Sequence, residues 1–65
     1  MNWDRVEGNW KEYKGKVKQM WRDFTDEELD VIEGTREELV GWLQLKYGYT
    51  RSQAAEEAET WVKRL

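Results

Sequence analysis

The side chains of this chain that are able to do chemistry are mostly carboxylates. Asp23, Asp26, Glu27 and Asp30 form the densest group, and carboxylate oxygens are ligands that Ca²⁺ accepts. Their spacing lacks the alternating Asp or Asn positions and the central Gly of an EF-hand loop. Helix starts favour acidic residues because of the helix dipole, and this accounts for most of the group. We therefore predict no metal site and no cofactor.

Catalysis by a nucleophile or a general base has few candidate residues. The chain contains no His and no Cys, which removes the commonest general base and the thiolate nucleophile. Ser52 is the only serine, and it lies inside a helix-capping sequence. The five glycines are isolated and form no phosphate-binding motif. We predict that the protein is not an enzyme.

Basic residues are concentrated in the first third of the chain. Residues 1–22 carry six Lys or Arg against three acids, whereas residues 23–40 carry one against eight. Lys11, Lys14, Lys18 and Arg22 form a candidate electrostatic surface for nucleic acid or an acidic protein. The net charge of -3 and the core-like spacing of the nearby aromatic residues argue against nucleic acid. The alternative is two solvated faces of opposite charge.

Three short sequences predict where helices begin. Thr25-Asp26-Glu27-Glu28, Thr35-Arg36-Glu37-Glu38 and Thr50-Arg51-Ser52-Gln53 each have a Thr followed three residues later by Glu or Gln. In such a capping box the Thr hydroxyl and the Glu or Gln side chain each accept a hydrogen bond from the other residue's backbone N–H. Gly34 directly precedes the second box, and Gly48 lies two residues before the third. At such positions a glycine can end the previous helix.

The segment before the first box predicts one long helix. Apolar residues recur there with alternating spacings of three and four, which is typical of one helix face; they are Trp3, Val6, Trp10, Tyr13, Val17, Met20 and Phe24. Gly8 and Gly15 fall on the opposite face and weaken the helix, so we expect its start to fray. A coiled coil is the alternative, but Trp and Tyr fit its seam poorly.

The remaining apolar residues predict three further helices around the same core. Leu29 and Ile32 face inward on the second helix. The third helix presents Leu39, Val40, Leu43 and Tyr47, and the fourth presents Ala54, Ala55, Ala58, Trp61, Val62 and Leu65. No linker interrupts the pattern. We predict an all-α fold, with four short helices in one compact domain over residues 1–65.

Three apolar side chains do not fit this core pattern cleanly. Trp42 and Leu45 lie off the apolar stripe of the third helix, and Trp3 lies near the fraying start of the first helix. They either fill gaps in the core or form an exposed patch that recruits a partner. Trp3, Trp42 and Leu45 are therefore a candidate partner surface.

The sequence resembles the CsbD-like family of small bacterial stress-response proteins. The matching motifs cover nearly the whole chain and are specific in combination: Gly8-Asn9-Trp10-Lys11, Lys14-Gly15-Lys16-Val17-Lys18, Trp21, Thr25-Asp26-Glu27-Glu28, Ile32-Glu33-Gly34, Leu39-Val40-Gly41 and Tyr47-Gly48-Tyr49. The resemblance implies a helical fold similar to the two roughly orthogonal hairpins of SAM-type domains. It supplies no catalytic or ligand residues. Positions 3, 42 and 45 are typically polar in this family pattern, which favours the patch interpretation for Trp3, Trp42 and Leu45.

The function that the resemblance implies is a non-enzymatic role in the bacterial general stress response. No molecular activity is established for the family, so we expect action either through an interaction or as a soluble protectant. The alternative is weak electrostatic binding of nucleic acid or an acidic protein. No segment reaches the roughly 20 apolar residues of a membrane span, and no signal peptide is visible. We expect a cytoplasmic monomer, with weak self-association or an unknown protein partner as further alternatives.

Overall fold

The computed structural model describes residues 2–65, and helices are its regular secondary structure over that range. They are α1 (Trp3–Gly8), α2 (Trp10–Met20), α3 (Asp26–Val31), α4 (Arg36–Tyr47) and α5 (Arg51–Lys63). The all-α prediction is confirmed. The prediction of four helices is wrong, because residues 2–65 form five. The arrangement as two orthogonal hairpins stays a prediction.

All three predicted capping boxes are present at the starts of α3, α4 and α5. The hydroxyls of Thr25, Thr35 and Thr50 each accept a hydrogen bond from the backbone N–H three residues later, at 3.1, 3.2 and 3.1 Å. The side chain at that third position accepts from the Thr backbone N–H in return. These reciprocal bonds satisfy N–H groups that have no partner inside the helix. The three predicted helix starts are confirmed.

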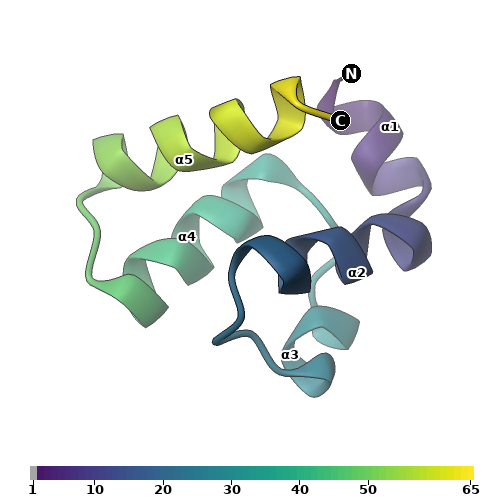
Figure 1. Ribbon diagram of the computed structural model, residues 1–65, viewed down its shortest axis with the longest axis horizontal. Helices are drawn as coiled ribbons and strands as arrows, with labels where there is room; N and C mark the ends of the chain where they lie inside the picture. The colour runs from purple at the N-terminus through teal and green to yellow at the C-terminus, as the bar shows by residue number, and fades with distance from the viewer. Residues whose placement is uncertain (1) are drawn as a thin grey trace.

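The predicted first helix is interrupted at Asn9, which separates α1 from α2. Asn9 has φ -124° and ψ 36°, outside the helical region, and it both ends α1 and begins α2. The segment where we expect fraying is helical from Trp3, and Asn2 caps α1 by accepting from the Arg5 N–H at 3.0 Å. Figure 1 shows α1 turned away from the axis of α2 and toward the C-terminal end of α5.

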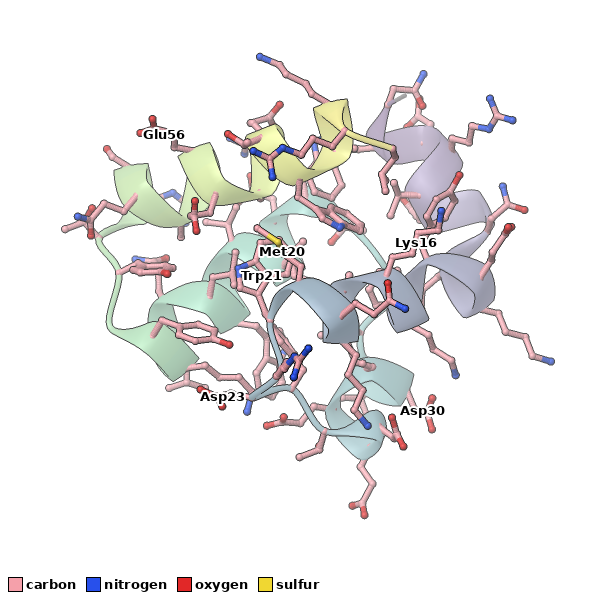
Figure 2. All side chains as sticks on the ribbon, in the orientation of Figure 1. Lys16, Met20, Trp21, Asp23, Asp30 and Glu56 are labelled. Carbon is pink, nitrogen blue, oxygen red and sulfur yellow. The ribbon has the colours of Figure 1, made fainter. Side chains whose placement is uncertain are left out.

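The predicted helix also ends earlier than its apolar pattern does. α2 stops at Met20 because Trp21 takes an extended conformation, with φ -125° and ψ 91°. This change of direction turns Trp21 and Phe24 into the core, where they are 3% and 1% exposed. Met20 is left 42% exposed at the end of α2 (Figure 2). The assignment of Met20 to the buried seam is therefore wrong, and Trp21 occupies that role.

The C-terminal half is a helical hairpin. α4 ends at Gly48, which adopts the left-handed conformation with φ 67°, and Tyr49 and Thr50 lead directly into α5. Figure 1 shows α4 and α5 side by side, and their packing is the most extensive in the fold. Ala54 and Ala58 are completely buried on α5, which allows close helix approach.

The core forms where the inner faces of all five helices meet. Its members are apolar or aromatic, and their only polar side-chain atoms are the Tyr13 hydroxyl and the indole nitrogens of Trp21 and Trp61: Val6, Tyr13, Val17, Trp21, Phe24, Leu29, Ile32, Leu39, Val40, Leu43, Ala54, Ala58, Trp61 and Val62. Burial of apolar and aromatic area on this scale is the main stabilising contribution available to so short a chain.

Gly34 permits a close approach of the turn between α3 and α4 to the Trp10 ring. It has φ 89°, and an added Cβ atom would lie 2.8 Å from the Trp10 ring. The Trp10 Nε1–H donates to the Leu29 backbone oxygen at 2.8 Å. Trp10 thus fixes α2 against α3 and the turn that follows it. A side chain at position 34 would collide with the Trp10 ring, so this contact requires glycine there.

Candidate interaction surface

The basic side chains of α2 face acidic side chains of α3 across a groove. Lys14 Nζ lies 2.7 Å from Asp30 Oδ1, and Lys18 Nζ lies 2.7 Å from Asp26 Oδ1. Lys11 lines the same groove, which has a volume of about 390 Å³. Figure 2 shows Asp30 on α3, at the edge of the molecule below α2. The candidate electrostatic surface is therefore interleaved with carboxylates from another helix.

These ion pairs change how much positive charge α2 presents to a ligand. The hydrogen bond and charge of Lys18 hold the pKa of Asp26 below its ordinary value, so the carboxylate stays ionised. Pairs this exposed add little stability, but each cancels one cation locally. Lys11 and Arg22 are exposed and have no ion pair within residues 2–65. Two of the four predicted cations thus remain uncompensated.

Trp3 lies against the core instead of projecting from it. Its ring centroid is 6.0 Å from that of Trp61, which in turn lies 5.8 Å from that of Trp21. The Trp3 Nε1–H donates to Glu59 Oε1 at 3.0 Å. Trp3 is half-buried, and its contacts join α1 to the C-terminal part of α5.

Trp42 and Leu45 have different environments although they lie on the same helix. Trp42 is half-buried, with its ring centroid 6.3 Å from that of Phe24. Leu45 is 75% exposed. Of the candidate partner surface, Leu45 is the side chain that projects fully into solvent, whereas Trp3 and Trp42 each cover part of the core.

Lys46 joins three segments of the chain, a role that the sequence did not indicate. Its Nζ lies 2.7 Å from Glu28 Oε1 and donates to the Asp23 backbone oxygen at 3.0 Å. It also lies 5.5 Å from the Phe24 ring centroid and 5.9 Å from that of Trp42, within cation–π range. A Lys in the last turn of a helix is ordinarily explained by the helix dipole, and this hides its tertiary role.

Glu59 is a second junction that the sequence did not indicate. Its Oε1 accepts from Arg36 Nε at 2.7 Å as well as from the Trp3 indole. The bond from Arg36, followed by the bond from Trp3, holds the pKa of Glu59 below its ordinary value. Glu59 therefore connects α1, α4 and α5 through one ionised carboxylate.

Two of the four carboxylates that first suggested chemistry form ion pairs between helices. Asp26 and Asp30 pair with lysines of α2, and the neighbouring Glu28 completes a capping box. No group of three or more His, Cys, Asp or Glu within residues 2–65 is placed to hold a metal ion. Across the same residues, no helix combines the length and the apolar character that a membrane crossing requires.

Comparison with known proteins identifies the family. The CsbD-like family model matches residues 4–56. The UPF0337 protein YjbJ of Escherichia coli K12 is 48% identical over 64 residues, covering 98% of this chain and 93% of the relative. The UPF0337 protein RPA4217 of Rhodopseudomonas palustris is 51% identical over 65 residues, covering 100% of this chain and 98% of the relative. The predicted resemblance is confirmed: this chain belongs to the CsbD-like family.

Proposed function

We propose that this protein is a non-enzymatic, cytoplasmic member of the bacterial general stress response that acts as a soluble protectant. The observation that carries the proposal is the use made of its polar side chains. Several of the groups able to do chemistry are used in helix caps and ion pairs, as Glu28, Asp26, Asp30 and Glu59 illustrate. Membership of the CsbD-like family supports the same conclusion.

A densely charged helical surface suits a protectant. Charged residues make up 38% of the chain and the net charge is -3, so the protein keeps a strongly hydrated surface and resists association at high concentration. Such a protein separates other macromolecules as water is removed, without a specific site. Leu45, Val31 and Met20, the large apolar side chains most exposed within residues 2–65, provide weak contacts with partly unfolded proteins.

The test is protection of an unrelated enzyme during drying or heating. We expect the enzyme to retain more activity with this protein than with the same mass of serum albumin. Equal protection by the two proteins would refute the protectant role. The double variant Trp42→Ala plus Leu45→Ala separates a partner-binding role from general protection. If sedimentation, captured partners and stability are all unchanged in that variant, Trp42 and Leu45 do not form a partner surface.

The second candidate function is electrostatic binding through Lys11, Lys14, Lys18 and Arg22. It is favoured by the uncompensated charges of Lys11 on α2 and of Arg22 just after its end. For each phosphate neutralised, the logarithm of the affinity for double-stranded DNA falls by about 0.9 for every tenfold rise in salt concentration. Two available cations predict a slope of about -2, whereas four would give a slope of about -4. Absence of binding at about 50 mM salt would exclude this function. The control is the double variant Lys11→Gln plus Arg22→Gln, which removes the two uncompensated cations.

A further inference from the structure

Gly15 is a helix-interior glycine that the fold does not require. It lies in the middle of α2 with a helical backbone, whereas the positive φ angles of the described chain belong to Gly34 and Gly48. A Cβ atom added at Gly15 would meet no other part of the fold within 4 Å. A glycine inside a helix weakens the helix relative to Ala. Gly15 therefore lowers stability without a packing reason or a backbone reason.

The missing side chain of Gly15 joins two hollows on the surface of α2. One is the groove between α2 and α3, which Gly15 and Lys18 help to line. The other, which we call the outer hollow, has a volume of about 360 Å³ and is lined by Gly15, Lys18, Gln19 and Arg22. A side chain at position 15 would occupy part of the space that the two hollows share.

The two hollows differ in the charge of their linings. Glu12, Asp26 and Asp30 line the groove between α2 and α3, and their carboxylates repel an anion. None of the residues that line the outer hollow is acidic. Arg22 is exposed and has no ion pair within residues 2–65. Lys18 pairs with Asp26, but the two side chains are 45% and 81% exposed, so the ammonium group can turn to another anion at little cost.

The lining of the outer hollow suits a phosphate group better than it suits an acidic protein. Ammonium and guanidinium groups bind phosphate oxygens, and the Gln19 amide supplies a further donor. None of the lining residues is a large apolar residue, whereas protein interfaces place apolar and aromatic anchors at their centre. Interfaces with nucleic acids are polar and positively charged. The outer hollow therefore favours a nucleic acid as its ligand.

We propose that the outer hollow binds the phosphodiester backbone of a nucleic acid, with one phosphate over Gly15 between Lys18 and Arg22. The proposal rests on the second candidate function and deepens it, because it names the ligand and the point of closest approach. Lys11 lies one helical turn before Gly15, about 6 Å along the axis of α2, and binds a neighbouring phosphate. The outer hollow has no aromatic ring in its lining, so the contact does not depend on base sequence.

Filling the outer hollow should stabilise the protein and weaken its binding. Gly15→Leu raises helix propensity, so the urea midpoint should rise. The same variant displaces one phosphate, which should lower the affinity for duplex DNA about tenfold at about 50 mM salt and change the salt slope from about -2 to about -1. A purely structural role of Gly15 does not produce these opposite changes. Gly15→Ala fills less of the space, and both quantities should shift in the same directions by smaller amounts.

Gly41→Leu is the matched control for these measurements. Gly41 is helical and has the same open space for a Cβ atom, but it lines neither hollow. The control should raise the urea midpoint and leave the affinity unchanged, as measured by the fluorescence anisotropy of a labelled DNA duplex. Equal losses of affinity in the two leucine variants, or an unchanged affinity in Gly15→Leu, overturn the proposal.

Two further arms separate failure of this inference from failure of the second candidate function. If Lys11→Gln plus Arg22→Gln abolishes binding while Gly15→Leu retains it, electrostatic binding stands and the outer hollow is not its site. If the original chain does not bind the duplex at about 50 mM salt, both are wrong. Poly-L-glutamate is the competitor. If it displaces the duplex as well as unlabelled DNA does at the same concentration of negative charge, the surface accepts carboxylates equally and the assignment to phosphate is overturned.

Discussion

Two regions of this protein begin their helices in different ways. From residue 25 onward, Thr25, Thr35 and Thr50 cap α3, α4 and α5 through reciprocal hydrogen bonds that also appear as a sequence motif. Before residue 25, Asn2 caps α1, but α2 begins after Asn9 with no side-chain cap, within an apolar pattern that runs through both helices. One set of boundaries is local in origin, and the other depends on contacts far along the chain.

The difference teaches that a helix boundary can arise from two separate causes. A capping box satisfies backbone N–H groups within four residues, so it acts whatever the rest of the chain does. The bend at Asn9 follows from the position of Trp3, which reaches Trp61 and Glu59 on α5. Removing a cap should therefore weaken one helix, whereas disturbing the bend should change how whole elements are arranged.

The largest effect is expected where the two halves meet, at Gly34. Gly34→Ala places a Cβ at a φ of 89° and 2.8 Å from the Trp10 ring. Backbone strain and overpacking together should lower the free energy of unfolding by about 2–4 kcal/mol. Urea denaturation measures this value. Gly41→Ala is the control, because Gly41 is helical with open space around it, and it should stabilise the protein by about 0.5–1 kcal/mol.

A smaller effect separates the two kinds of helix start directly. Thr35→Ala removes the hydroxyl that accepts from the Glu38 N–H at 3.2 Å and should cost about 1 kcal/mol. Asn9→Ala removes no cap and should change the free energy of unfolding by less than about 0.5 kcal/mol. Both values come from urea denaturation at a dilute concentration that keeps the chain monomeric. Equal losses in the two variants would show that Asn9 also caps its helix.

The smallest effects are expected from the ionised junctions as pH falls. The pKa of Glu28 is lowered by hydrogen bonds from Lys46 and then from the Thr25 N–H, and the pKa of Glu59 by those from Arg36 and Trp3. A lowered native pKa means that the stabilisation is complete above the ordinary carboxylate value of about 4.3. It is lost as pH falls through the lower native value. The urea midpoint should therefore drop in acid.

Variants assign that pH dependence to its residues. Glu28→Gln and Glu59→Gln should each lower the urea midpoint at pH 7, and each should show a shallower decline toward acid than the original chain. Glu56→Gln is the control, because Glu56 is exposed and has no ion pair within residues 2–65 (Figure 2). An equal change in the control would mean that overall charge, and not these junctions, sets the acid sensitivity.

The sequence named the residues of the candidate electrostatic surface but not their arrangement. The basic residues of α2 are on the surface, but nothing in the linear pattern indicates that Asp30 and Asp26 neutralise Lys14 and Lys18. Lys46 lies in the last turn of α4, where the helix dipole alone favours a cation, so its position in the sequence gives no sign of its tertiary contacts. These pairings depend on how α2, α3 and α4 are oriented, and side chains from different elements meet only after those orientations are set.

The sequence by itself determined the all-α class, the starts of α3, α4 and α5, and the left-handed end of α4 at Gly48. Each depends on hydrogen bonds or backbone preferences among neighbouring residues, so a short stretch contains the whole cause. Only the tertiary structure decided the exposure of Met20 and the inward turn of Trp21. Those features arise because the distant aromatic residue Trp61 provides burial that outweighs the local preference for one continuous helix.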